Sequence, residues 1–169
     1  MNHHEYESIT LRAMGDEGLE DGLLLLTDPS IKQTYMLPDF SSRSEAEGLY
    51  HRLKALSQQE GRYVRGVFLG ERMIGFLNEV EINEDSIELG WVIHPDCQNR
   101  GYATCAVMQA VEELFALGYT VVTAGAFSEN LASIRVMEKC GMIRLDKTEE
   151  IEYRGAVHRC VYYAIRRNA

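Results

Sequence analysis

The stretch Gln98-Asn99-Arg100-Gly101-Tyr102-Ala103 lies where a predicted strand over residues 87–94 gives way to a predicted helix. After it, apolar residues recur at the three- and four-residue spacing of one helix face: Tyr102, Ala106, Val107, Ala110, Val111, Leu114 and Phe115. The first turn of a helix leaves backbone N–H groups unpaired and carries the positive end of the helix dipole. Gly101 lets an anion approach that backbone closely. We therefore predict an anion site here and interpret it as a pyrophosphate site.

Two common pyrophosphate motifs are excluded. The stretch contains no G-x-G-x-x-G pattern, and no Gly-Lys pair of a P-loop occurs anywhere in the chain. The remaining alternative is an ordinary strand–turn–helix connection with a glycine in its tight turn. These six residues alone leave both interpretations open.

The stretch resembles the [RQ]-x-x-G-x-[GA] signature of the GCN5-related N-acetyltransferases (GNAT), which cradle the pyrophosphate of acetyl-CoA. A second segment is similar to the N-x-x-S … E-K-x-G-F pattern of the RimJ/RimL-like branch; it consists of Asn130-Leu131-Ala132-Ser133 and Glu138-Lys139-Cys140-Gly141-Met142. Residues 35–40 and 152–155 are also similar to that branch. The resemblance covers nearly the whole chain and implies a single N-acetyltransferase domain over residues 1–169.

Hydrophobic periodicity and turn residues predict a mixed α+β fold. Helices are expected over 18–27, with Asp16 as its cap, and over 41–59, 102–115 and 130–140. Strands are expected over 8–13, 63–69, 72–82, 87–94, 119–126, 143–153 and 156–165, with hairpin turns at Gly70-Glu71 and Arg154-Gly155. In the strand over 72–82, we expect Ile74 and Phe76 to share a face. The resemblance implies one mostly antiparallel sheet of six or seven strands, about four helices, and a splay after strand 87–94 that receives the pantetheine arm.

Composition favours one globular domain with a sizeable core, because 46% of the 169 residues are apolar and 25% are charged. No apolar run approaches the roughly 18 residues of a membrane span, and residues 1–5 lack a signal-peptide pattern. We therefore expect a cytoplasmic protein with no membrane partner. The net charge of −9 argues against nucleic-acid binding. It either biases encounters toward cationic partners or serves only to keep the protein in solution.

Cysteine and histidine spacing predicts no metal site. No cysteine pair has metal-ligand spacing, so reduced thiols are expected at Cys97, Cys105, Cys140 and Cys160. Three histidines, His51, His94 and His158, also lack ligand spacing, and His3-His4 is at most a weak terminal site. Acetyl-CoA is the only co-substrate that the resemblance implies.

The resemblance also assigns the cofactor-binding residues. We define residues 98–104 as the phosphate loop; its members are Gln98, Asn99, Arg100, Gly101, Tyr102, Ala103 and Thr104. The resemblance implies that the backbone N–H groups of residues 99–104 face the pyrophosphate. Arg100 adds a charged contact or is simply solvated. Backbone groups of Val92 and Ile93 pair with the pantetheine amides, and one backbone N–H there serves as the oxyanion donor. Asn130 contacts the pantetheine arm, caps its helix, or does both.

The sequence leaves more than one interpretation open for the general acid, the general base and the acceptor pocket. Many family members place a tyrosine at the position of Met137, so Ser133 becomes the candidate acid or thiolate hydrogen-bond donor; the alternative is an ordinary helix serine. Glu88 is the first candidate for the base because its strand feeds the phosphate loop, and Glu152 follows from the branch resemblance. Either carboxylate is alternatively a solvated face residue, and the amine needs no dedicated base if it binds neutral. The expected pocket is lined by Tyr35, Phe40, Glu79 and Tyr153, unless these aromatics are core.

Together these features predict an acetyl-CoA-dependent N-acetyltransferase in which a neutral amine attacks the thioester directly. The acceptor is a protein N-terminus, a polyamine, an amino acid or an aminoglycoside-type amine, and the protein is expected to be a monomer or homodimer. The alternative is a non-catalytic CoA-binding sensor or partner module of the same fold.

Overall fold

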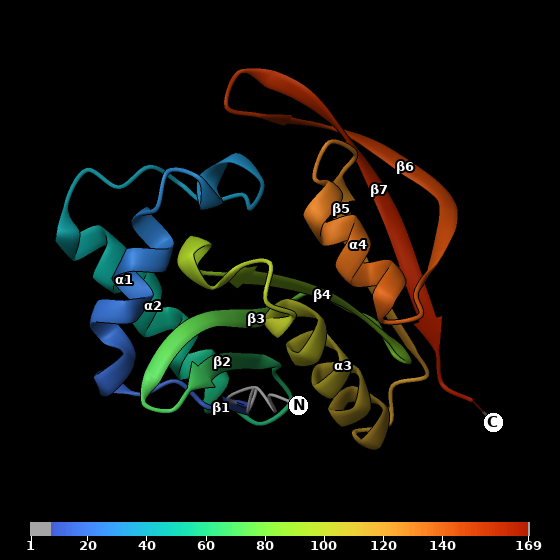
Figure 1. Cartoon of the computed structure of the whole chain (residues 1–169), viewed down its shortest axis with the longest axis horizontal. Helices are drawn as coiled ribbons and strands as arrows, with labels where there is room; N and C mark the ends of the chain where they lie inside the picture. Colours follow the sequence, from blue (N-terminus) through green and yellow to red (C-terminus); the bar gives the residue numbers. More distant parts are fainter. Residues whose placement is uncertain (1–7, 169) are drawn as a thin grey trace, which may run out of the picture.

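The computed structural model describes residues 8–168, so the expectations for residues 1–5 and for His3-His4 lie outside the described residues. One seven-stranded sheet has the order β1-β2-β3-β4-β5-β7-β6 (Figure 1). Its strands are β1 (Ile9–Arg12), β2 (Val64–Leu69), β3 (Arg72–Ile82), β4 (Ser86–Ile93), β5 (Val121–Phe127), β6 (Ile143–Tyr153) and β7 (Ala156–Arg166). The helices are α1 (Leu19–Thr27), α2 (Arg43–Ser57), α3 (Tyr102–Ala116) and α4 (Leu131–Lys139), and short 3-10 turns lie at Asp16–Gly18, Ile31–Gln33 and Pro95–Cys97. The mixed α+β fold is confirmed, and none of the helices described is long and apolar enough to cross a membrane.

The sheet is split between β4 and β5. All other neighbouring strands pair antiparallel, whereas β4 and β5 run parallel and pair only from Ser86 opposite Val121 to Glu88 opposite Thr123. Beyond these pairs β4 continues along β3 and β5 continues along β7. The predicted splay is therefore present, and it begins one residue after Glu88.

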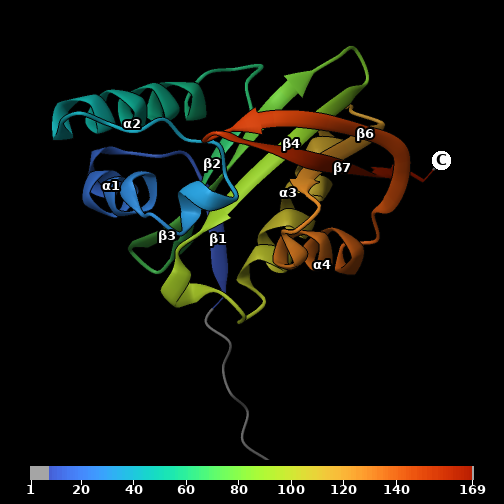
Figure 2. The same ribbon diagram turned by 90° about the horizontal axis from the view of Figure 1, so that it is seen from above.

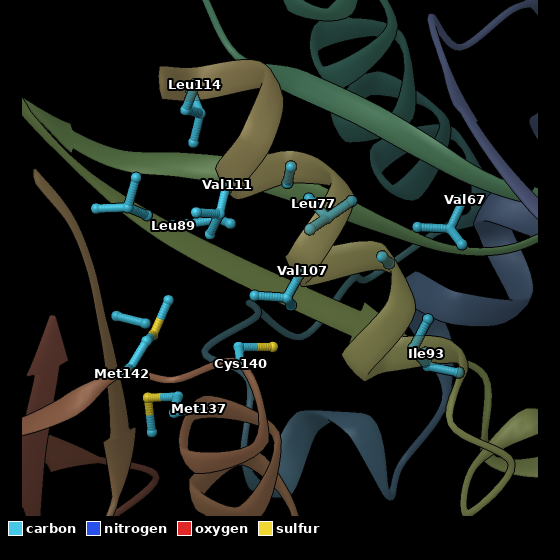
Figure 3. Close-up of a cluster of buried hydrophobic side chains, with 14 of the residues drawn as sticks. Val67, Leu77, Leu89, Ile93, Val107, Val111, Leu114, Met137, Cys140 and Met142 are labelled. Carbon is cyan, nitrogen blue, oxygen red and sulfur yellow. The ribbon is translucent and has the colours of Figure 1, made fainter. Parts of the chain in front are cut away.

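Helices cover both faces of the sheet (Figure 2). One face packs against α3 and α4, and Figure 3 shows part of this core, in which Leu77 and Leu89 of the sheet meet Val107 and Val111 of α3. The other face packs against α1 and α2 through a second core that includes Leu25, Tyr50, Phe68, Met73 and Phe76. We call these the α3 face and the α1 face.

Glycine in α1 has a packing reason. A Cβ atom at Gly22 would lie 2.3 Å from the ring of Tyr50, so α1 and α2 approach each other only because that position has no side chain. The Tyr50 hydroxyl then donates to the Gly15 carbonyl oxygen at 2.6 Å. This close helix contact explains why a helix forms despite the internal Gly22, which lowers the helix propensity of the segment.

Two local predictions were wrong. Asp16 caps no helix: Gly15 and Gly18 occupy the cap positions without side-chain bonds, and the Asp16 carboxylate lies 2.5 Å from Lys54 Nζ instead. In β3, pairing with β2 slips between Met73 and Gly75, so Ile74 is the extra residue of a bulge. Ile74 therefore packs on the α3 face while Phe76 packs on the α1 face, although simple alternation places them together.

Candidate active site

The phosphate loop presents free backbone donors at the start of α3. Asn99 and Gly101 have positive φ angles of 60° and 83°, and Gly101 occupies the N-cap position without a side-chain bond. Within residues 8–168, no protein acceptor receives a hydrogen bond from the N–H groups of residues 99–104; the Cys105 N–H is the first to bond, to the Gly101 carbonyl at 3.0 Å. Six consecutive free donors at a helix N-terminus have the geometry and the partial positive charge that favour an anion.

Side chains around Asp96 hold this loop to the sheet. Gln98 Nε2 donates to the Ile93 carbonyl at 3.0 Å, so its side chain braces the end of β4. The Asp96 carboxylate accepts from Arg72 at 3.0 Å and from Cys97 Sγ at 3.0 Å, and His94 Nδ1 lies 2.8 Å away. The Cys97 and Arg72 contacts hold the pKa of Asp96 far below its usual range. The loop is thus preorganised by ionic contacts to β3.

A cleft of about 1080 Å³ runs from the phosphate loop through the split between β4 and β5. Most predicted site residues line it: Tyr35, Glu79, Glu88, Val92, Ile93, Gln98, Asn99, Gly101, Tyr102, Ala103, Thr104, Asn130 and Ser133. Four predicted residues do not line it: Phe40, Arg100, Glu152 and Tyr153. Because the split passes through the sheet, the cleft connects the α3 face to the α1 face.

Asn130 and Ser133 form a fixed pair at the start of α4. Asn130 Oδ1 accepts from the Ser133 N–H at 3.2 Å, which makes Asn130 the N-cap of the helix. Asn130 Nδ2 donates to Ser133 Oγ at 3.1 Å. Since the hydroxyl oxygen already accepts a bond, its hydrogen is available to donate into the cleft. Met137, one turn later, is fully buried in the core and contributes no polar group.

Glu88 lies on the α1 face where the split begins. In the register of β3 and β4 it is directly opposite Glu81, and Gly90 is opposite Asn78, whose Oδ1 accepts from Tyr35 at 2.6 Å. Burial raises the pKa of Glu88; Lys147 lowers it, and the neighbouring charge of Glu81 raises it. A carboxylate with a raised pKa beside a cleft has the properties of a general base.

Sequence reasoning missed Lys147 on β6 and Tyr162 on β7, which line the cleft beside Glu149. The Tyr162 hydroxyl donates to Glu149 Oε2 at 2.7 Å, and this bond lowers the pKa of Glu149 while burial raises the pKa of Tyr162. Lys147 Nζ lies 3.4 Å from Glu149 Oε1 and 4.3 Å from the centre of the Tyr162 ring. The alternation of residues 156–166 was the available signal, because it places Tyr162 on the same face as Cys160, the residue that pairs with Glu149.

Several predicted pocket residues are structural. The Glu79 carboxylate bonds to Arg62 and to the Tyr63 N–H, and it lies opposite Leu89 on the α3 face, away from Glu88. The Tyr153 hydroxyl donates to the Lys32 carbonyl at 2.5 Å and accepts from the Leu37 N–H at 3.2 Å.

Phe40 and Glu152 also lie away from the cleft. Phe40 packs against the α1-face core, with Lys32 Nζ 5.2 Å from its ring centre. Glu152 is exposed on β6 opposite the exposed Val157. Of the two carboxylates predicted as bases, only Glu88 borders the cleft.

Comparison with known proteins agrees with this geometry. Residues 8–143 match the family described as the acetyltransferase (GNAT) domain. An uncharacterized N-acetyltransferase, YnaD, from Bacillus subtilis (strain 168) is 40% identical over 62 residues, a segment that spans 36% of this chain and only 36% of the relative.

Two solved structures have the same fold. Spermidine N-acetyltransferase from Vibrio cholerae, in complex with CoA and spermine, superposes with a TM-score of 0.79 at 23% identity over 94% of this chain and 95% of that one. The acetyltransferase from Salmonella typhimurium that modifies the N-terminal serine of ribosomal protein L7/L12 gives a TM-score of 0.79 at 17% identity over 95% and 96%. Because the family match covers far more than half of its 169 residues, this chain belongs to the GNAT acetyltransferase family.

Proposed function

We propose that the chain is an acetyl-CoA-dependent N-acetyltransferase that moves an acetyl group to a primary amine by direct attack on the thioester. One observation carries the proposal: the split sheet joins six free N–H groups on the α3 face to the Glu88 carboxylate on the α1 face through one cleft. Cofactor and amine can therefore enter from opposite faces and meet where β4 and β5 separate.

The residues of the cleft fit the cofactor. The N–H groups of residues 99–104 would hold the pyrophosphate, since they have no protein acceptor among the residues that the structure describes. The edge of β4 that faces the split lacks a partner strand beyond Glu88, so backbone groups of Ile93 can pair with the pantetheine amides, whereas those of Val92 point toward Phe76 of β3. Their side chains are buried in the core, which leaves the backbone as the binding element.

Glu88 and Ser133 divide the proton transfers. Glu88 removes a proton from the amine, and its raised pKa matches that task better than an ordinary glutamate does. Ser133, whose oxygen is already bonded by Asn130, donates its hydroxyl hydrogen toward the departing thiolate. A backbone N–H at the end of β4 stabilises the oxyanion. Proton removal from the amine and proton donation to the thiolate thus take place on opposite sides of the split sheet.

The acceptor is assigned only as a primary amine. The matched structures are named for a spermidine and for a protein N-terminal serine as acceptors, which supports an amine of either kind. Similarity to the RimJ/RimL-like branch rests on the sequence segments around Asn130 and Gly141 and on residues 35–40 and 152–155. A cytoplasmic location and a monomer or homodimer stay predictions.

Calorimetric titration with acetyl-CoA, followed by a thiol-release screen over amines and N-terminal peptides, tests this function. We expect binding with one site per chain and turnover with at least one amine. Binding without turnover over the whole panel would support the sensor alternative. Tighter binding of NADH than of acetyl-CoA would overturn the assignment of the phosphate loop.

A further inference from the structure

At the α1-face end of the cleft, the Tyr162 ring and the Glu149 carboxylate form a cation-binding site, which we call the seat. The side chain of Lys147 occupies it. Lys147 Nζ lies 4.3 Å from the centre of the Tyr162 ring and 3.4 Å from Glu149 Oε1. An aromatic face beside a carboxylate attracts ammonium groups. The Tyr162 hydroxyl donates to Glu149 Oε2 at 2.7 Å, which orients the carboxylate beside the ring.

Lys147 is held loosely in this seat. Its side chain is 52% exposed, and its 3.4 Å ion pair is longer than the roughly 2.7–2.9 Å of a strong charge-assisted bond. Lys54, by contrast, is 24% exposed and lies 2.5 Å from Asp16. Lys147 also comes from the stretch of β6 between Arg144 and Thr148 where the register with β7 shifts. An external ammonium can therefore replace it at small cost.

The charges around the seat are not balanced. On the α1-face side of the cleft, three carboxylates line the wall, those of Glu81, Glu88 and Glu149. Among the described residues Lys147 is the single lining cation of this wall, which therefore has two more carboxylates than cations. The other cationic lining residues, Arg135 and Lys139, come from α4 on the α3 face. The wall thus attracts an acceptor with more than one positive charge.

We propose that the acceptor is a diamine or longer polyamine whose second ammonium displaces Lys147 over Tyr162 and beside Glu149 while its reacting amine faces Glu88. This inference rests on the proposed function. Lys147 acts as an internal competitor: a monoamine leaves it in place, and only an acceptor with a distal cation gains the contacts of the seat.

The test compares acetyl transfer to putrescine and to n-butylamine, which have the same carbon chain and differ in the distal ammonium. The specificity ratio is kcat/KM for putrescine divided by kcat/KM for n-butylamine. We expect a wild-type ratio of about ten or more, since tenfold corresponds to about 1.4 kcal/mol. Lys147→Met should raise the ratio several-fold through a lower KM for putrescine, whereas Glu149→Gln should lower it about tenfold.

Matched variants separate the aromatic face from the carboxylate. Tyr162→Phe keeps the ring and should lower the ratio less than Tyr162→Leu, which removes it. Lys139→Met removes a lysine that lines the same cleft from α4, and the ratio should stay at the wild-type value. Circular dichroism confirms that each variant is folded.

A wild-type specificity ratio near one would overturn the inference, and so would a ratio that neither Lys147→Met nor Glu149→Gln changes. In either case, turnover of n-butylamine would still support the proposed function. Calorimetry of both amines with the CoA complex gives the same comparison without turnover. Putrescine binding that Lys147→Met strengthens supports the seat, and equal binding of the two amines contradicts it.

Discussion

Asn130 holds Ser133 at two points: its Oδ1 accepts from the Ser133 N–H at 3.2 Å, and its Nδ2 donates to Ser133 Oγ at 3.1 Å. One side chain therefore begins helix α4 and also orients the proposed proton donor. The two roles can be separated by substitution, because the cap needs only an oxygen and the hydroxyl contact needs the amide nitrogen.

Ser133→Ala should lower kcat by roughly 100-fold, the lower range for loss of a general acid, with the Kd for acetyl-CoA unchanged. Steady-state kinetics and calorimetry measure the two quantities. An unchanged kcat would make Ser133 an ordinary helix residue.

Asn130→Asp keeps the cap oxygen and loses the donor to Ser133 Oγ, so kcat should fall while the melting temperature changes little. Asn130→Ala should lose both and destabilise the protein by about 1 kcal/mol. Urea unfolding of the two variants, measured beside kcat, separates the effects. Equal kcat values for Asn130→Asp and the wild type would contradict the orienting role.

Gly101→Glu should abolish acetyl-CoA binding, because it places a carboxylate where the pyrophosphate is proposed to lie. Gly101 has a φ of 83°, and a Cβ there meets no atom within 4 Å, so any side chain costs about 1 kcal/mol of backbone strain and no steric clash.

Gly101→Ala is the matched control for that substitution. It carries the same strain without the charge, and it should keep most of the cofactor affinity. A folded Gly101→Glu variant that still binds CoA would refute the phosphate-loop assignment.

Glu88→Gln should lower kcat/KM and also raise the melting temperature near neutral pH. Burial raises the folded-state pKa of Glu88 above its unfolded value, so the stability linked to the protonated form is present below the unfolded pKa and is lost as pH rises through the folded pKa. The gain in melting temperature should therefore vanish at about pH 4. A variant less stable than the wild type at neutral pH would contradict this assignment.

Tyr153→Phe should destabilise the protein by about 1 kcal/mol, because the Leu37 N–H and the Lys32 carbonyl each lose a partner. Urea unfolding measures the change. Tyr163→Phe is a suitable comparison, since its hydroxyl makes one longer contact, 3.4 Å to Glu138. Equal effects of the two substitutions would show that the Tyr153 bonds contribute nothing specific.

Local chemistry made most of the fold predictable. Gly70-Glu71 and Arg154-Gly155 connect their hairpins as expected, and positive φ angles at Gly70, Arg154 and Gly155 show why such residues mark these turns. The free N–H groups at the start of α3 were predictable for the same reason, because they belong to the backbone and follow from a glycine at the helix N-terminus.

Side-chain roles were less predictable because they depend on register and on distant segments. The bulge at Ile74 changes which face each β3 residue occupies, and alternation contains no sign of it. Tyr153 bonds to residues more than 110 positions away, so no local pattern distinguishes it from a pocket residue. Lys147 and Glu149 meet Tyr162 only through the pairing of β6 with β7.

The short pairing of β4 with β5 has a further consequence for the protein in the absence of cofactor. Beyond Glu88 and Thr123, two strand edges face each other across the split without exchanging hydrogen bonds. Exposed strand edges are templates to which other polypeptides add during aggregation. A bound cofactor that pairs with these edges would act as a removable strand, and substrate supply would then help to keep the protein from self-association.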